Sequence, residues 1–189
     1  MELLTPEEAK GLSGGALTEW EADLYLPAAL EMAEEYLNRR LEYREDETEV
    51  FDGGQRVYLL RRYPVEQVHE FTVCGEDFEP EFWHLDAEHG VIRINRAALY
   101  GGMADVRIRY AGGWTKENAP AKLKIALSVL ACALRDAAEN GGEPVSANGE
   151  RIGNYQAGYI QQGKSDAHGL RMIAPAAEAL LRGYAGRMV

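Results

Sequence analysis

The sequence has few of the residues that build disulfide frameworks or metal sites. Among its 189 residues are two cysteines and four histidines. Cys74 and Cys132 fall in apolar runs, and neither has another Cys or a His at metal-ligand spacing. We therefore expect two buried free thiols in a reducing compartment, and no disulfide scaffold or zinc site.

Long apolar runs are also lacking, and we expect no leader peptide. The longest nearly apolar stretch, 123–134, is far shorter than the ~20 residues that a bilayer crossing needs. The first seven residues have neither the basic region nor the apolar core of a signal peptide. We expect a protein without a membrane span, made in a cytoplasm and built as one globular domain.

Basic charge is scarce in the first part of the chain. The net charge is −11, and residues 1–50 hold 14 acidic and 4 basic side chains, a net of −10. The acidity therefore belongs to the N-terminal part, which we expect to be helical. Proteins that bind nucleic acid usually concentrate the opposite charge in a patch, so any contact with DNA is expected to be passive.

Helix signals open the chain. Thr5 and Glu8 are spaced as a capping box, with Pro6 in the first turn, and Thr18 and Glu21 repeat the pattern. Pro27 is expected to kink the second helix or mark the start of its straight half. The apolar stripe of that helix is predicted to comprise Trp20, Leu24, Leu26, Leu30, Ala33, Leu37 and Leu41.

The pattern changes to short alternating runs at about residue 48. Residues 49–60 predict two strands around an Asp-Gly-Gly turn, and further strands are expected at 68–74, 83–85, 91–94 and 105–110. An apolar central helix follows from Pro120. Residues 140–150 form a loop, 151–169 are extended or mobile, and a final helix starts near Pro175. We predict an α+β fold: a helical bundle of N-terminal, central and C-terminal helices with an inserted antiparallel β-hairpin or sheet region.

One segment matches a nucleotide-binding motif. Residues 158–165, Gly-Tyr-Ile-Gln-Gln-Gly-Lys-Ser, satisfy the Walker A pattern. The motif needs a buried strand before it and a helix after it, but residues 152–157 are not an apolar run and 166–169 make a poor first helical turn. We therefore expect no nucleotide site.

A second candidate is a cluster of possible metal ligands, His84, Asp86, Glu88 and His89. The alternative is a polar turn between two strands, which needs Asp and Gly at these places. We favour the turn. No Gly-x-Ser-x-Gly elbow is present, and neither thiol has a nearby His. The sequence thus predicts a protein that is not an enzyme and has no cofactor.

Two arginine pairs, Arg61–Arg62 and Arg107 with Arg109, could bind phosphate. Such residues more often pair with acidic neighbours, and the acidic N-terminal part makes ion pairs between subunits a further hypothesis.

The order of these elements resembles the tailed-phage head–tail connector family, also called head-completion or adaptor proteins. The resemblance covers almost the whole chain, and each piece of it is turn and helix chemistry. It is carried by residues 5–10, 21–24, 29–39, 48–54, 63–65, 106–115, 151–155 and 180–184.

This resemblance implies a structural subunit of a virion, located at the head–tail junction. The family forms a twelvefold ring beneath the portal protein, extends the DNA channel, helps to retain packaged DNA, and presents a docking surface to the next connector or tail-completion protein. One connector-like domain is then expected over 1–189, divided into N-terminal helices (1–47), a β-rich insertion (48–115), a central helix (120–139) and a C-terminal segment (140–189).

In this family the C-terminal segment commonly contacts the portal. The corresponding candidates for an assembly or portal interface are Arg151, Asn154, Tyr155, Tyr159, Leu180, Leu181 and Tyr184. Two alternatives stay open: another phage or prophage tail-completion structural protein, and a small nucleotide- or metal-dependent enzyme.

Overall fold

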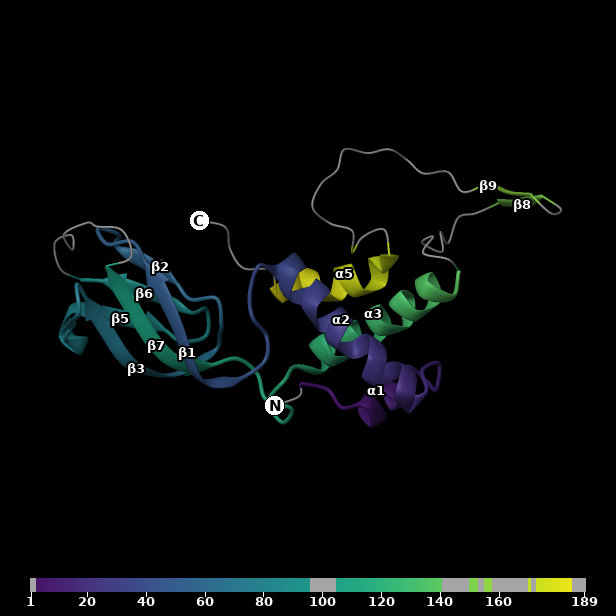
Figure 1. The fold of residues 1–189 in the computed structure, drawn as a ribbon, viewed down its shortest axis with the longest axis horizontal. Helices are drawn as coiled ribbons and strands as arrows, with labels where there is room; N and C mark the ends of the chain where they lie inside the picture. The colour runs from purple at the N-terminus through teal and green to yellow at the C-terminus, as the bar shows by residue number, and fades with distance from the viewer. Residues whose placement is uncertain are drawn as a thin grey trace. The chain divides into compact units, whose positions relative to one another are not determined.

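A computed structural model describes residues 3–95, 105–140, 150–152, 155–157, 170 and 173–184. The chain divides into two compact units (Figure 1). The β unit comprises Met1–Leu3 and Asn38–Ala119, and the helical unit comprises Leu4–Leu37 and Pro120–Val189. The α+β fold class is confirmed. The expectation of one connector-like domain over 1–189 stays a prediction.

The helical unit is built from α1 (Pro6–Leu12), α2 (Glu19–Leu37), α3 (Ala121–Glu139) and α5 (Pro175–Leu181), followed by the 3₁₀ turn η2 (Arg182–Tyr184). α3 contacts each of the other three helices, as its apolar sequence predicts (Figure 1). The buried positions are mostly alanine and leucine, so the helices approach closely. The fully buried examples are Ala9, Leu17, Ala22, Ala29, Ala33, Leu123, Ala126, Leu130, Ala131, Ala177 and Leu181.

Both predicted capping boxes are present. The Glu8 backbone N–H donates to the Thr5 hydroxyl at 3.3 Å, and the Thr5 N–H donates to the Glu8 carboxylate at 3.1 Å. Thr18 and Glu21 make the same reciprocal pair at the start of α2. α2 continues through Pro27, which lies on its exposed side.

The predicted stripe of α2 is wrong at both ends. Trp20 and Leu24 are 72% and 52% exposed, because they lie on the side of the helix opposite to the buried Ala22, Leu26 and Ala29. Trp20 and Leu24 have the four-residue spacing of a helical stripe, but the stripe that faces the core is the one that contains Ala22, Leu26 and Ala29.

At the other end, α2 stops at Leu37 because Asn38 adopts a positive φ of 50°. Leu41 is therefore outside the helix and is buried in the β unit instead.

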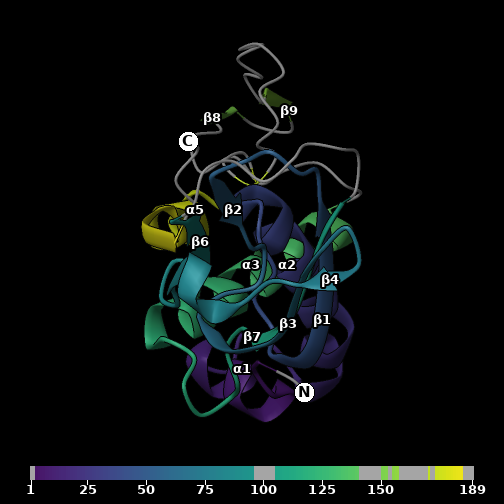
Figure 2. The ribbon, with the colours of Figure 1, turned by 90° about the vertical axis from the view of Figure 1, so that its left-hand side faces the viewer.

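The β unit contains two antiparallel sheets, which face the viewer in Figure 2. One has the order β1 (Arg44–Phe51), β7 (Val106–Gly112), β3 (Val65–Val73), β4 (Glu76–Asp77). The other has the order β2 (Val57–Leu59), β6 (Val91–Ile94), β5 (Trp83–Asp86), with the short η1 turn (Pro80–Phe82) before β5. The strands predicted at 68–74, 83–85, 91–94 and 105–110 are thus confirmed within a few residues.

The two sheets share one core. Tyr58 and Ile92 of the smaller sheet cluster with Phe71, Val106 and Ile108 of the larger one. Aromatic rings cross between the sheets, since the Tyr58 ring lies edge-on to Phe71 with the centroids 6.2 Å apart. The β unit is therefore a sandwich, and burial alternates most clearly along β2, β6 and the first part of β7.

The two strands predicted around the Asp-Gly-Gly turn over 49–60 are present, but they do not pair with each other as a hairpin. β1 pairs with β7, and β2 pairs with β6. The Asp52–Gly54 turn therefore passes the chain from one sheet to the other, an outcome that local turn chemistry does not distinguish from a hairpin.

Two other expectations need correction. Cys74 is exposed at a positive φ of 53° in the β3–β4 turn, and Cys132 is only partly buried. The acidity of residues 1–50 is not all helical, since five of its carboxylates lie in or just before β1: Glu42, Glu45, Asp46, Glu47 and Glu49.

Beyond α3, the structure describes β8 (Glu150–Ile152) and β9 (Tyr155–Ala157), which pair antiparallel. This agrees with the extended chain expected there. Most of the predicted 140–150 loop and the remainder of 151–169, including the Walker-like segment 158–165, lie outside the described residues.

Candidate assembly surfaces

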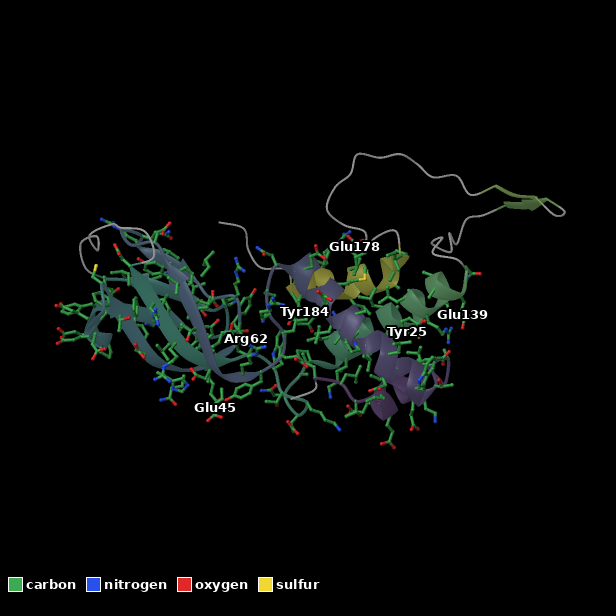
Figure 3. All side chains as sticks on the ribbon, viewed as in Figure 1. Tyr25, Glu45, Arg62, Glu139, Glu178 and Tyr184 are labelled. Carbon is green, nitrogen blue, oxygen red and sulfur yellow. The ribbon has the colours of Figure 1, made fainter. Side chains whose placement is uncertain are left out.

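A network of charged and polar side chains closes one end of the sandwich. The Tyr110 hydroxyl donates to a carboxylate oxygen of Glu49 and accepts the Arg62 backbone N–H at 3.1 Å. The Arg62 guanidinium is almost fully buried, donates to Glu47 at 3.1 Å and also donates to the Glu42 carbonyl. Figure 3 labels Arg62 among the side chains of this unit.

Burial raises the pKa of Glu49, because desolvation of the carboxylate outweighs the stabilising hydrogen bonds from Tyr110 and the Arg61 backbone. Burial, with the neighbouring Glu49 charge, also raises the pKa of Tyr110, so this hydroxyl stays protonated. The Tyr110 hydroxyl on β7 therefore links Glu49 of β1 to the backbone N–H of Arg62. Its role is structural, because it holds β1 and β7 to the chain around Arg62.

Arg39 is a second buried cation in the β unit. Its guanidinium lies over the Tyr63 ring at 3.3 Å and over the Trp114 ring at 4.4 Å, and it donates to the Tyr63 carbonyl. Stacking between two aromatic faces is how a desolvated guanidinium is accommodated. This arrangement ties the chain at 38–40 to the segments just before β3 and just after β7, which lie at the same end of the large sheet.

The polar turn favoured for His84, Asp86, Glu88 and His89 is confirmed. β5 ends at Asp86, whose carboxylate accepts the His89 backbone N–H at 3.3 Å and lies 3.0 Å from its ring Nδ1. That hydrogen bond lowers the pKa of Asp86. Within the described part of the chain, no group of three or more His, Cys, Asp or Glu residues is placed to hold a metal ion.

The arginine pairs mostly find acidic partners in their own chain. Arg62 pairs with Glu47, and Arg109 lies 3.2 Å from Glu70 and 3.6 Å from Asp46. The carboxylates that bind these arginines come from β1 and β3, so the preference for acidic neighbours over phosphate is confirmed for Arg62 and Arg109.

The outward side of α2 is acidic and partly apolar. The helix has six carboxylates and no basic residue. Trp20 and Leu24 are its exposed apolar side chains, and Glu31 and Glu35 continue the same side toward the C-terminal end. Because α2 has no basic residue of its own and exposes Trp20 and Leu24, this side of the helix is a candidate contact surface.

A shallow hollow opens between α1 and α3 in the same unit. Its volume is about 290 Å³, and it is lined by Glu8, Gly11, Leu12 and Lys124. Leu12 is 45% exposed there, and Lys124 lies 3.8 Å from Glu8 across the two helices. Lys124 is itself partly buried, and the exposed Lys122 at the start of α3 does not line the hollow.

The residues predicted at a portal interface divide into three groups. Asn154 and Tyr159 lie outside the described residues, while Arg151 and Tyr155 belong to β8 and β9. Leu181 is fully buried, as part of the packing of α5 in the helical unit, whereas Leu180 and Tyr184 are partly exposed.

Glu178 is the polar anchor of that helix. It accepts hydrogen bonds from the Tyr36 hydroxyl at 3.3 Å and from Arg182 at 3.0 Å, so α5 is fixed to α2. Figure 3 labels Glu178. None of the helices in the described ranges is long and apolar enough to cross a membrane.

The fold is shared with chains of solved gene transfer agent particles. One is in the neck of the native particle with C12 symmetry, with a TM-score of 0.56 and 16% identity over 100% of this chain and 94% of that chain. Another is in the neck of the empty particle with C6 symmetry, with a TM-score of 0.54 and 16% identity over 93% of this chain and 82% of that chain.

A third is in the virion of the native particle, with a TM-score of 0.58 and 17% identity over 99% of this chain and 91% of that chain. The sequence itself matches no protein-family model. It also matches no curated protein. The likeness therefore shows that this chain has the α+β fold of those particle chains.

Proposed function

We propose that this chain is a structural subunit of a phage-like head–tail connector, a twelvefold ring docked beneath the portal at the neck of the virion. One observation carries the proposal: the fold likeness to a chain of a C12-symmetric neck spans all of this chain and 94% of that one. A likeness that runs through both units favours the same whole-chain role, rather than a borrowed domain.

The charge of α2 supports a place beside packaged DNA. A ring with the exposed side of α2 that carries Glu31 and Glu35 turned toward its channel repels the phosphate backbone, so DNA passes without binding. In this role the ring extends the channel, helps to retain the packaged DNA and offers its far side to the next connector or tail-completion protein.

Portal contact is assigned to the C-terminal segment. Leu180 and Tyr184 are accessible on α5 and η2, and Arg151, Asn154, Tyr155 and Tyr159 lie in the preceding segment. Leu181 contributes indirectly, because its buried side chain holds α5 in the helical unit.

The test is assembly with the portal protein encoded by the same genome. The chain alone and mixed with purified portal is examined by mass photometry and negative-stain electron microscopy. The expected result is a ring with twelve copies of this chain on each portal. A chain that remains monomeric at high concentration and leaves the portal unchanged contradicts the proposal.

The same experiment separates the alternatives. A tail-completion protein binds a purified tail and not the portal. A nucleotide- or metal-dependent enzyme is stabilised by its ligand, so a rise in melting temperature with ATP or a divalent cation favours that reading.

A further inference from the structure

β2 is an edge strand whose outer backbone groups have no partner in the described chain. The Ile94 N–H donates to the Arg56 carbonyl at 2.9 Å, so these two residues are a hydrogen-bonded pair. Pairs in an antiparallel ladder alternate between hydrogen-bonded and non-hydrogen-bonded, so Val57 and Leu59 form the second kind of pair with β6. Their N–H and C=O groups therefore point to the other edge, where no described strand pairs with β2.

The same two residues carry exposed aliphatic side chains. Val57 is 38% and Leu59 is 41% exposed, while Tyr58 between them is buried in the sandwich. Proteins usually protect an edge strand with charged residues, as in β1, where five of the eight residues are charged. β2 has the sequence Val-Tyr-Leu and lacks this protection. Such an edge is where an extended segment of another protein can add as a further strand.

Exposed arginines surround this edge. Arg56 precedes β2, Arg61 follows it by two residues, and Arg93 lies directly opposite Val57 on β6. None of these three arginines belongs to an ion pair in the described chain. The arginines that do are Arg44, Arg62, Arg109, Arg135 and Arg182.

Carboxylates close to these arginines are already engaged. The Arg61 charge acts on Glu49, which accepts hydrogen bonds from a tyrosine hydroxyl and from the Arg61 backbone N–H. The Arg93 charge acts on Asp86, whose carboxylate is hydrogen-bonded within its own turn. In a chain with a net charge of −11, three exposed arginines outside any described ion pair indicate an acidic partner.

We propose that β2 binds an extended acidic segment of a partner protein, which adds to the free edge as a new strand of the smaller sheet. The backbone of this segment hydrogen-bonds to Val57 and Leu59, and its carboxylates pair with Arg56 and Arg61 at the two ends of the strand. Nucleic acid suits the edge less well, because phosphates accept from its N–H groups but use neither its carbonyls nor its aliphatic side chains. This inference concerns the β unit alone and does not rest on the proposed ring.

The experiment uses the full chain and the synthetic peptide Ser-Glu-Thr-Val-Thr-Val-Glu-Ser, blocked at both ends, whose glutamates have the sequence spacing of Arg56 and Arg61. Amide hydrogen exchange measured by NMR reports on the edge directly. With bound peptide, exchange at Val57 and Leu59 should slow by at least about tenfold. Exchange at Tyr58 should change less, because its N–H faces β6 and not the peptide.

Charge reversal tests the arginines. The double variant Arg56→Glu, Arg61→Glu should bind the acidic peptide at least about tenfold more weakly, and it should bind a peptide with lysines in place of the glutamates better than the parent chain does. Arg107→Glu is the matched control, since it reverses an exposed arginine that has no ion pair in the described chain and lies on β7 of the other sheet. Circular dichroism and the melting temperature show that each variant folds, as expected for exposed side chains.

Slowed exchange at Val57 and Leu59, together with binding of the lysine peptide by the double variant, supports strand addition at β2. Unchanged exchange at about millimolar peptide overturns the proposal. So does an Arg107→Glu chain that loses as much affinity as the double variant. A short double-stranded DNA that binds the parent chain and not the double variant, while the peptide leaves exchange unchanged, overturns it in favour of a phosphate ligand.

Discussion

The two units differ in where they place their charged side chains. The β unit buries the guanidiniums of Arg39 and Arg62, one stacked on aromatic rings and the other paired with Glu47. The helical unit buries mainly alanine and leucine, and α2 leaves most of its carboxylates at the surface. Stability of the β unit should therefore depend on a few polar side chains, whereas the helical unit has a surface free to vary for assembly.

Gly113→Ala should have the largest effect on the stability of the β unit relative to the helical unit. Gly113 has a φ of +99°, and a Cβ there would lie 2.4 Å from the Glu42 carbonyl oxygen. We expect a loss of at least about 3 kcal/mol in the free energy of unfolding of the β unit. Gly11→Ala in α1 is the control, with open space around the new Cβ and a gain of at most about 1 kcal/mol.

Urea unfolding followed by fluorescence in a Trp20→Phe background measures this effect. Two of the three tryptophans then remain, Trp83 and Trp114, and both lie in the β unit. A Gly113→Ala chain as stable as its parent contradicts the close approach of the Gly113 backbone to Glu42.

Arg62→Met comes next. The change leaves Glu47 without its buried partner and the Glu42 carbonyl without its donor, so we expect a loss of about 3 kcal/mol. Arg109→Met removes an ion pair whose arginine is 43% exposed, and should cost no more than about 1 kcal/mol. Equal losses of unfolding free energy for Arg62→Met and Arg109→Met in the same fluorescence assay would show that burial does not determine how strongly these ion pairs stabilise the β unit.

Tyr110 and Tyr58 form a matched pair of buried tyrosines. Tyr110→Phe removes hydrogen bonds to Glu49 and to the Arg62 N–H, for an expected loss of about 1–2 kcal/mol. Among the residues that the structure describes, the buried Tyr58 hydroxyl has no hydrogen-bond partner, so Tyr58→Phe should leave stability within about 0.5 kcal/mol or raise it. A larger loss for Tyr58→Phe contradicts this difference.

Glu49→Gln gives a smaller effect that depends on pH. The pKa of Glu49 is raised in the folded state, so the folded chain holds this proton more tightly than the unfolded chain. Its contribution to stability is present below the ordinary pKa of a glutamate and is lost as pH rises through the folded pKa. The amide oxygen can still accept from Tyr110 and the Arg61 N–H.

The stability of Glu49→Gln relative to wild type should therefore increase from about pH 4 to about pH 7. Urea midpoints across this range measure it. A difference that decreases with pH means that the hydrogen bonds outweigh desolvation at Glu49.

Glu31→Lys on the outward side of α2 should have the smallest effect. The exposed lysine replaces a like-charge neighbour of Glu35 one turn away with an opposite charge, so stability should change by at most about 0.5 kcal/mol. Thermal unfolding by circular dichroism measures it. A large loss would show that this side of α2 is not free to vary.

Local signals predicted well where one residue fixes its own neighbourhood. The capping boxes at Thr5 and Thr18, the apolar α3 and the β5–β6 turn at Asp86–Gly90 are examples, because hydrogen bonds within four residues or one helix decide them. Prediction failed where the decision was distant, as in the strand partners on either side of Asp52–Gly54 and the side of α2 that carries Trp20.

The sequence by itself determined the α+β composition and the order of the elements. The tertiary structure decided which polar groups are internal and which are available. Glu47 and Glu49 became partners of Arg62 and Tyr110, while the carboxylates of α2 stayed outside. The physical reason is that burial and pairing depend on residues tens of positions apart, which no local periodicity encodes.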